Sequence, residues 1–512
     1  MKNPKILLLF GFLFLTLISY VYYKQSVNFA YVDEVNNIAA GYFMLQGREL
    51  YKEIFFNHQI LGGYASYAVQ ALLHPQSLYQ LIVYHRVTVI GFSFLCGLAL
   101  VWRFRLMGLG IVMLYEIIKF YVFGHLFLAE AFVVYPLVYL FCVCWYRFVA
   151  QRSIGRFDLT VSTLAVFFVV FMREPFIPLA VLLYGIILWK SKRREAAVSL
   201  LFFVVTSAVL IFTSSWQEYY TQVVTANFQT IIPSEQALHE TGGYRYLKMA
   251  FYPVYILLAP QKGYFGVVSS WIAVLFLVCI GLLVFKFKKY WIVLSVVFVL
   301  VLANIRFVPP ANVFYSAFHM TVWYGLVIAF ICLCLEYLFS IKHKKLYMVL
   351  LGGYVGLVAV AFFLPGSVVF EKVDTQKAFN ENYGHYYAAG ETIRRLSQPD
   401  DQVFVDMWDM LVYWQAGRES AYHYSIFLPI MLSLPQYSDA RSEMFERNPP
   451  DFYYVGCGSD EYFSGFLTPD VAQKYTQLKS RGKSSCLYIK NEKLDTIAPA
   501  SLESIKTLGY EL

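Results

Sequence analysis

Asp33 and Glu34 are the adjacent residues of this chain whose types and position best suit acid–base chemistry. They open a segment in which apolar residues recur at helical spacing, and Gly47 is suited to end that helix. A carboxylate at such a place can take a proton from a reacting hydroxyl group. Acidic residues in a first helical turn also cap the helix or complement its dipole. The pair therefore predicts either a general base or a structural helix start.

A second polar segment follows in the same loop and runs from Gly47 to Leu61. It carries Tyr51 and then the sequence Phe56-Asn57-His58-Gln59-Ile60-Leu61. The side chains of Asn57 and His58 can both donate and accept hydrogen bonds. The loop thus adds polar groups that could bind a ligand beside the two carboxylates.

The order of these two features resembles that of polytopic glycosyltransferases of the GT-C type. The likeness is greatest to the group of protein O-mannosyltransferases and aminoarabinose transferases, which carry an Asp-Glu pair just after the first transmembrane helix. Their second motif has the form G…Y…(N/D)-x-H/K-P-P-L, and here Gln59 and Ile60 stand where the Pro pair would be. The resemblance is strongest over residues 1–70, and the stretch Gly390–Tyr424 is also typical of such enzymes.

This resemblance implies that a sugar moves, with inversion, from a polyprenyl-phosphate donor to an acceptor outside the cytoplasm. Asp33 is then the expected general base, with Glu34 beside it, and Asn57 and His58 are expected to bind substrate. Tyr51, Trp408 and Trp414 could stack on a sugar, but packing in the core is favoured for all three, and Tyr51 is kept as a candidate for substrate binding. The acceptor could be a glycan, a lipid or a protein. Because a lipid-linked donor already has a charged leaving group, no nucleotide-binding domain and no metal ion is expected, although a divalent metal ion could bind beside Asp33, Glu34 and His58.

Ionisable residues inside apolar segments are costly and are functional candidates by default. Arg173 and Arg306 could hold the lipid phosphate, as basic residues at similar places do in the relatives, or could anchor the chain at the membrane interface. Glu174 and Lys262 are predicted to complete the substrate site. The remaining charges at this depth are His85, Arg86, Glu116, Lys119, His125, Glu130, Arg245 and Lys248. Among these, we expect Glu116–Lys119 to be a structural ion pair and both histidines to be packing residues with satisfied hydrogen bonds.

The composition requires a membrane around these charges. Hydrophobic residues make up 59% of the 512 residues and charged residues only 14%, whereas soluble proteins hold about a quarter of charged residues. Aromatic residues reach 19%, which excludes a disordered chain. The basic residues form short runs between apolar stretches, which indicates membrane topology rather than a nucleic-acid surface.

About eleven apolar segments are long enough to cross or nearly cross a bilayer. They fall at 6–23, 78–101, 106–123, 127–147, 159–172, 175–190, 195–213, 264–285, 290–307, 312–338 and 345–364. The first lacks a small-residue cleavage site, so it is read as an uncleaved helix. The segment 249–260 is too short to cross and is expected to be interfacial or re-entrant. Runs of basic residues such as Lys286–Lys289 predict a cytoplasmic N-terminus in the plasma (inner) membrane.

Residues 370–512 have an ordinary soluble composition and predict a small extracytoplasmic α/β domain. Strands are expected at 403–405, 452–455 and 486–489, and helices at 386–396 and 469–478. Cys457 and Cys486 could pair there, whereas the other cysteines lie in apolar segments and suit packing. The predicted organisation is a mainly α-helical membrane module over 1–369, with the motif in its first outer loop at 24–77, followed by the domain at 370–512.

Two other functions fit the same composition. The chain could transport or flip lipid-linked sugars, although no inverted repeat is visible. It could also be a non-catalytic assembly protein that keeps the fold. Only an enzyme requires an ionised carboxylate at Asp33.

Overall fold

The structure is a computed structural model that describes residues 4–231, 251–260, 262–304, 317–455 and 469–512. The chain divides into two compact units. The first, here the helical unit, consists of residues 1–26, 86–210 and 236–373. The second, here the mixed unit, consists of residues 27–85, 211–235 and 374–512. Most of the first predicted outer loop therefore shares a unit with the C-terminal residues.

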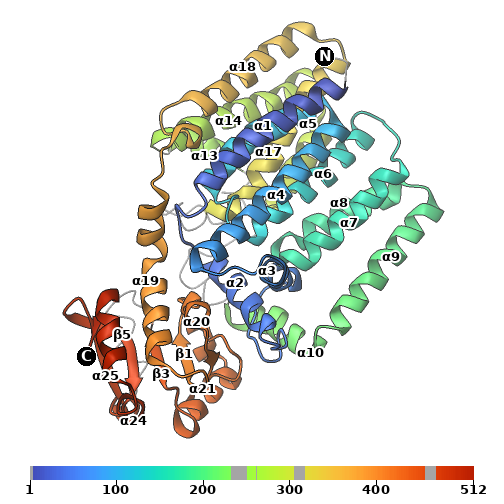
Figure 1. Ribbon diagram of the computed structural model, residues 1–512. Coiled ribbons are helices and arrows are strands. Elements are labelled where there is room, and N and C mark those ends of the chain that lie inside the picture. The colour runs from blue at the N-terminus through green and yellow to red at the C-terminus, as the bar shows by residue number, and fades with distance from the viewer. Residues whose placement is uncertain (1–3, 232–250, 261, 305–316, 456–468) are drawn as a thin grey trace. The chain divides into compact units, whose positions relative to one another are not determined.

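Long apolar helices build the helical unit, and two of them include residues 78–85 and 211–212 of the mixed unit. They are α1 (Pro4–Lys24), α4 (Leu78–Phe104), α5 (Leu106–Ile118), α6 (Ala129–Phe148), α7 (Arg156–Met172), α8 (Ile177–Lys190), α9 (Arg193–Phe212), α13 (Tyr252–Leu258), α14 (Gly263–Gly281), α15 (Tyr290–Leu302), α17 (Met320–Ser340) and α18 (Lys344–Phe363). α6 and α17 pack against each other (Figure 1). A Cβ atom on Gly325 of α17 would lie 2.6 Å from Val134 Cγ2 of α6, so this close approach requires glycine.

Seven helical segments of the described chain are long and apolar enough to cross a membrane. They are Pro4–Lys24, Leu78–Phe104, Ala129–Phe148, Arg193–Phe212, Gly263–Lys286, Ala317–Ser340 and Lys344–Phe370. The most apolar part of α6 is 89% buried inside the protein, whereas that of α9 is 0% buried. A helix this apolar with no buried face suits a lipid surrounding. The prediction of a mainly helical chain compatible with several membrane crossings is confirmed.

The described part of every apolar segment predicted to cross contains a helix. The helices α5, α7, α8 and α15 have only 13 to 17 residues, which is shorter than a full membrane crossing needs. The number of crossings therefore stays a prediction. The predicted break at Arg173–Pro175 is confirmed, since α7 ends at Met172 and α8 begins at Ile177. The segment predicted to be too short for a crossing contains α13, a helix of seven residues.

A six-stranded sheet forms the C-terminal part of the mixed unit. Its strands are β1 (Gln402–Asp406), β2 (Glu419–Ser420), β3 (Phe452–Val455), β4 (Tyr475–Ser480), β5 (Lys483–Lys490) and β6 (Tyr510–Glu511), in the order β2-β1-β3-β5-β4-β6. The first three strands of this order are parallel and the remaining pairs are antiparallel. The helices of this part are α19 (Thr375–Leu396), α20 (Leu411–Ala416), α21 (Pro435–Arg447), α23 (Pro469–Ala472), α24 (Asn491–Leu494) and α25 (Pro499–Ser504).

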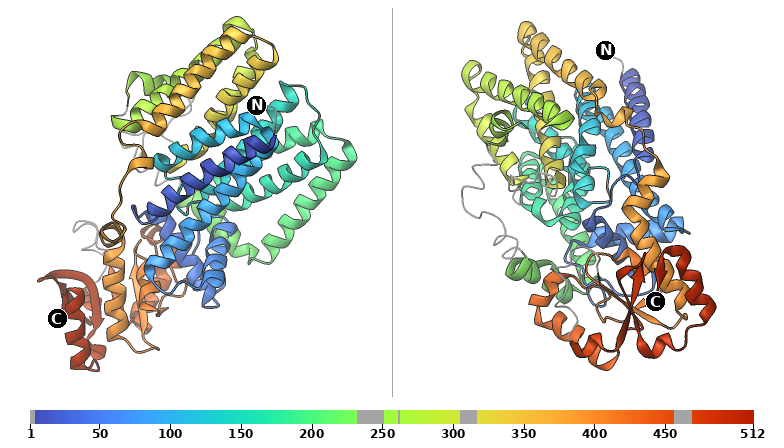
Figure 2. Two further views of the ribbon diagram at one scale, coloured as in Figure 1. Left: turned by 45° about the horizontal axis from the view of Figure 1, so that its top comes forward. Right: turned by 90° about the vertical axis from the view of Figure 1, so that its left-hand side faces the viewer.

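Helices lie on both sides of this sheet (Figure 2). Successive side chains of a strand point to opposite faces. Phe404 of β1 and Tyr453 of β3 are paired in register, and both pack against Phe445 of α21. Tyr454 therefore lies on the opposite face, and there its hydroxyl group bonds to Asp409. The core of the domain is the pair of apolar strands β1 and β3.

The predicted strands at 403–405, 452–455 and 486–489 are confirmed, and the predicted helix at 386–396 forms the end of α19. The predicted helix at 469–478 is wrong beyond Ala472, because β4 begins at Tyr475. β4 and β5 form a hairpin whose two turn residues, Arg481 and Gly482, both have positive φ. Such a turn matches the twist of two strands, and tertiary pairing here overrides the helical pattern. Cys486 is disulfide-bonded, while Cys457 lies outside the described residues.

Candidate functional site

The two predicted catalytic carboxylates lie in the first turn of α2 (Val32–Leu45), in the mixed unit. The helix runs as expected, and Gly47 follows its end with a φ of 89°. Asp33 is half-buried, whereas Glu34 is only 1% exposed. The N-cap residue is Tyr31, whose own side chain does not cap the helix. Asp33 and Glu34 both lie in the first helical turn, where acidic side chains complement the helix dipole, and their role in capping stays a prediction.

A polar network fixes α2 against α3 (Ile60–Leu73), a helix that the sequence patterns did not predict. A Cβ atom on Gly41 would lie 2.3 Å from Ser66 Oγ, so the two helices touch through glycine. Gln70 Nε2 donates a 3.0 Å hydrogen bond to the carbonyl oxygen of Ile38. Ser66 Oγ lies 2.8 Å from Nε2 of His85, whose Nδ1 lies 2.7 Å from the carbonyl oxygen of Leu81.

His85 is thus the satisfied packing residue that was expected, and its ring interacts electrostatically with Glu34. His125 is different. Its ring is buried and stacks on that of Phe120 with 4.4 Å between centroids, but neither ring nitrogen has a hydrogen-bond partner among the described residues. The expectation that His125 is satisfied is therefore wrong. Its surroundings in the helical unit are aromatic, which explains why the ring stacks and does not bond.

The loop after α2 is held from inside by Tyr51. This residue adopts a φ of 72° and is 0% exposed, and its hydroxyl group donates a 2.9 Å hydrogen bond to the carbonyl oxygen of His58. Gln222, from η3 (Tyr220–Ile231), accepts a hydrogen bond from the backbone N–H of Phe56 at 2.7 Å and donates one to the carbonyl oxygen of Tyr51. With no exposed surface, Tyr51 fits the core-packing interpretation and acts by shaping the loop.

Asn57 and His58 occupy different surroundings. Asn57 is buried, and its backbone carbonyl oxygen accepts a 2.9 Å hydrogen bond from Asn227 Nδ2. The Oδ1 atom of Asn57 has no hydrogen-bond partner within the described chain. His58 is half-buried, and its ring meets Phe56 edge to face with 5.6 Å between centroids. Among the predicted site residues of the first loop, Asp33 and His58 are therefore those that keep part of their side chains accessible.

α19 anchors the segment that leads into α2. Tyr383 donates a hydrogen bond from its hydroxyl group to the carbonyl oxygen of Phe29 at 2.9 Å, and Asn382 Nδ2 donates to the carbonyl oxygen of Val27 at 3.2 Å. One turn farther, Tyr386 is buried, and burial raises the pKa of its hydroxyl group. The negative charges of Asp409 and Glu34 raise this pKa further. Tyr386 thus lies within electrostatic range of both carboxylates.

The other end of the loop is held by the segment around β2. The backbone N–H of Phe55 donates a 2.9 Å hydrogen bond to the carbonyl oxygen of Tyr424, and Ser425 Oγ donates to that of Glu53 at 2.7 Å. Arg48 Nη2 lies 3.9 Å from a carboxylate oxygen of Glu419. The loop that carries the candidate base is therefore held at both ends by hydrogen bonds between residues 354 and 372 positions apart in the chain.

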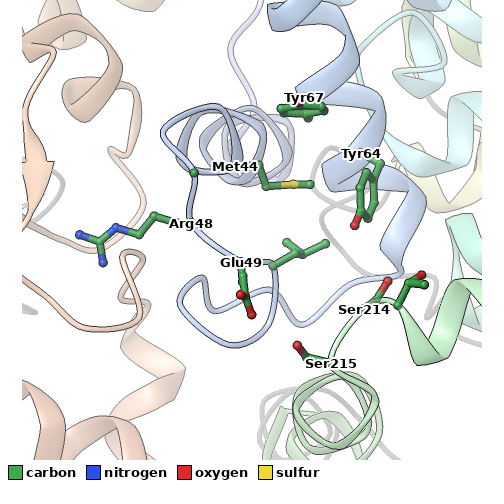
Figure 3. A pocket seen from close by; sticks show the side chains of 10 residues that line it. Met44, Arg48, Glu49, Tyr64, Tyr67, Ser214 and Ser215 are labelled. Carbon is green, nitrogen blue, oxygen red and sulfur yellow. The ribbon is translucent and has the colours of Figure 1, made fainter.

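A pocket of about 310 Å³ lies at the far end of α2. Its lining residues are Met44, Gly47, Arg48, Glu49, Leu50, Tyr64, Tyr67, Thr213, Ser214 and Ser215. Figure 3 shows the side chains of Met44 and Tyr64 directed into it, whereas the guanidinium group of Arg48 is directed away. With a rise of 1.5 Å per residue, Met44 lies ~16 Å along the helix from Asp33. The pocket therefore cannot contain a bond on which Asp33 acts.

In the helical unit, Arg173 is buried in an acidic setting. Its Nε lies 2.7 Å from Glu130 Oε1 and its Nη1 lies 3.2 Å from Glu174 Oε1. His319 Nδ1 lies 3.6 Å from the same oxygen of Glu130. Lys262 is exposed just before α14. Arg306, Arg245 and Lys248 lie outside the described residues.

The expected ion pair between Glu116 and Lys119 is confirmed. The two charged groups lie 2.6 Å apart and both side chains are at most 2% exposed. The hydroxyl group of Tyr135 donates to Glu116 and accepts a 3.1 Å hydrogen bond from Lys119 Nζ. This satisfied network explains the pair without any ligand.

Sequence reasoning missed Tyr386 and Asp409. Asp409 lies just beyond the strand predicted at 403–405, and an acidic residue at the carboxyl end of a parallel strand is a signal for a site. The sequence could not show that the strand is parallel to both neighbours.

Within the described residues, no group of three or more His, Cys, Asp or Glu side chains could hold a metal ion. The comparisons with known proteins assign no family to the chain, because no family model matches it and no curated protein matches it.

Proposed function

We propose that this chain is a multi-pass membrane glycosyltransferase of the GT-C type. It would transfer a sugar from a polyprenyl-phosphate donor to an acceptor hydroxyl group on the extracytoplasmic face. The observation that carries the proposal is the half-buried Asp33 in the first turn of α2, held in place by α3, the loop and α19. Such rigid support is what a catalytic carboxylate needs. The membrane module would cross the bilayer about eleven times, as the apolar segments predict.

In this mechanism Asp33 removes the proton from the acceptor hydroxyl group. The acceptor oxygen then forms a bond to the anomeric carbon of the donor sugar, on the face opposite the phosphate. The bond between that carbon and the phosphate oxygen breaks, and the polyprenyl phosphate leaves with the electron pair. The configuration at the anomeric carbon is therefore inverted. The positive end of the α2 dipole favours the ionised form of the base before each turnover.

The leaving phosphate needs a cation, and Arg173 is the buried arginine that the sequence predicts for this role. Its guanidinium group donates a hydrogen bond from Nε to Glu130 Oε1 and another from Nη1 to Glu174 Oε1. Glu130 would keep the guanidinium plane fixed, while the half-buried Glu174 would exchange its place for a phosphate oxygen. Lys262 and Arg306 remain further candidates for contacts with the donor.

The test is the consumption of polyprenyl-phosphate sugars by the purified protein supplied with membrane lipid extract, followed by mass spectrometry. Wild type should consume a donor, and Asp33→Asn should reduce the rate by 10²-fold or more, in the range of a lost general base. Glu381→Gln, which changes an exposed carboxylate on α19, is the matched control and should keep wild-type turnover. Equal turnover by Asp33→Asn would move the role of base to Glu34 or Glu174. Absence of turnover with donor still bound would favour transport or assembly.

A further inference from the structure

The chain reverses direction across the sheet next to β1. From β1 it crosses to β2 on one side, and from β2 it crosses back to β3 on the other side. In open α/β sheets, ligands bind beyond the carboxyl ends of the parallel strands at such a switch point. Here Asp406 ends β1 directly opposite Val455, the last residue of β3.

The backbone immediately beyond β1 is strained. Met407 has a φ of 105°, which is rare for any residue other than glycine. Its N–H donates a 3.2 Å hydrogen bond to the carbonyl oxygen of Phe427, which holds this conformation. Strain of this kind persists where a structure needs a fixed geometry. It places Trp408 and Asp409, both half-buried, at the carboxyl end of the strand.

Polar side chains from two other elements surround Asp409. Tyr454 of β3 donates a 3.1 Å hydrogen bond to Asp409 Oδ2, and Tyr386 interacts electrostatically with this carboxylate. His385 is adjacent to Tyr386 on α19 and is exposed, and it interacts electrostatically with Asp409. The group combines an indole ring, a carboxylate, an imidazole ring and a phenol.

The carboxylate of Asp406 lies on the other face of the sheet, where it has a structural role. It is 0% exposed, and Arg441 Nη2 lies 2.6 Å from its Oδ2, which also accepts a 2.9 Å hydrogen bond from Tyr453. This pair joins β1 to α21 and β3 from within the core. It holds the end of β1 in place and leaves Asp409 as the carboxylate that can meet a ligand.

We propose that Trp408, Asp409, His385 and Tyr386 form a saccharide-binding subsite and that the acceptor is therefore a glycan. This inference rests on the proposed function. The flat indole ring can pack on the C–H face of a sugar ring, while the carboxylate and imidazole groups bond to its hydroxyl groups. The anionic Asp409 disfavours a phosphate at this place, so the subsite suits the acceptor and not the donor.

α19 joins this subsite to the candidate base. The side chains of Asn382 and Tyr383 hold the segment 27–29, which leads directly into Asp33, and Tyr386 is one turn farther along the same helix. A glycan bound at Asp409 would therefore lie against the element that positions the base. The electrostatic interaction of Tyr386 with both Glu34 and Asp409 is consistent with this placement.

The test is binding of free oligosaccharides to the full-length protein in detergent. The probe is an array of neutral oligomers of mannose, glucose, galactose and N-acetylhexosamines. Asp409→Asn and Trp408→Phe should each weaken binding of the preferred oligomer at least tenfold. The control is Asp400→Asn, the same change at an exposed position beside the amino end of β1, which should bind as wild type does.

A second measurement needs no variant. Hydroxyl-radical footprinting of wild type should show that the bound oligomer protects Trp408 from oxidation. No binding of any oligomer, or binding without protection of Trp408, would overturn the subsite. Asp33→Asn should retain binding, which separates the two proposals. Glycan binding at Trp408 without donor turnover would support the subsite and refute the transferase. Turnover onto a lipid or protein acceptor without glycan binding would support the transferase and refute the subsite.

Discussion

The hydroxyl group of Tyr383 donates a 2.9 Å hydrogen bond to the carbonyl oxygen of Phe29, a residue 354 positions earlier in the chain. Phe29 lies only four residues before Asp33. The C-terminal domain therefore fixes the backbone that enters α2, and the candidate base depends on this long-range contact. An enzyme that requires a fixed base should be sensitive to its loss.

We expect Tyr383→Phe to lower turnover more than it lowers stability. The change removes one partly buried hydrogen bond and leaves the carbonyl oxygen of Phe29 without this donor, which costs about 1–3 kcal/mol. Because the base loses its support, kcat should fall while the KM for the donor changes little. The measurement is donor consumption together with thermal unfolding. Tyr387→Phe, at an exposed position of the same helix, is the control and should match wild type. An unchanged kcat for Tyr383→Phe would contradict the role of α19.

Gly41→Ala should disrupt the packing of α2 on α3. The added Cβ atom would lie 2.3 Å from Ser66 Oγ and 2.6 Å from the backbone nitrogen of Tyr67, and a backbone cannot move aside cheaply. Overpacking of this kind costs about 1–3 kcal/mol, more than alanine gains in helix propensity. The melting temperature should therefore fall, with loss of donor turnover.

The matched control is Gly91→Ala in α4, where a Cβ atom would meet nothing within 4 Å. There the gain in helix propensity is unopposed, and the melting temperature should stay the same or rise. If Gly41→Ala and Gly91→Ala both had the melting temperature of wild type, the prediction that α2 and α3 pack too closely for a side chain at Gly41 would be contradicted.

The ion pairs of Glu391 predict a pH dependence of stability. Burial alone would raise the pKa of this carboxyl group, but hydrogen bonds from Arg394 and Arg395 outweigh burial and lower the pKa below its ordinary value of 4.5. The unfolded chain then takes up the proton first as the pH falls. The stabilisation is fully present above the ordinary pKa and disappears as the pH falls through the pKa of the folded protein.

Glu391→Gln removes this stabilisation at every pH. Its melting temperature should therefore lie below that of wild type at neutral pH, and the difference should narrow below about pH 4.5. Glu381→Gln on the same helix disturbs only an exposed pair with Lys377, 3.8 Å away, and should leave the melting temperature nearly unchanged. If the difference in melting temperature between wild type and Glu391→Gln grew as the pH fell, the pKa of Glu391 would be raised on folding and not lowered.

Local patterns predicted those elements whose packing follows from their own sequence. α2 was predicted because apolar spacing and Gly47 mark both of its ends, and β1 and β3 were predicted because they are short apolar runs. The hairpin of β4 was missed, since its strand is specified by pairing with β5. The contacts of Tyr383 and Ser425 with the first loop could not be predicted, because they join segments that are distant in the sequence.

Charge pairs inside the helical unit offer the last test. Glu116→Gln would leave the ammonium group of Lys119 buried without its counter-charge, and breaking a buried pair costs about 3–5 kcal/mol. The melting temperature in detergent should fall strongly. The double variant Glu116→Leu with Lys119→Met removes both charges and should recover much of this loss. A single variant that remains stable but loses donor turnover would instead assign Glu116 to the chemistry, and the ion pair would then be part of the substrate site.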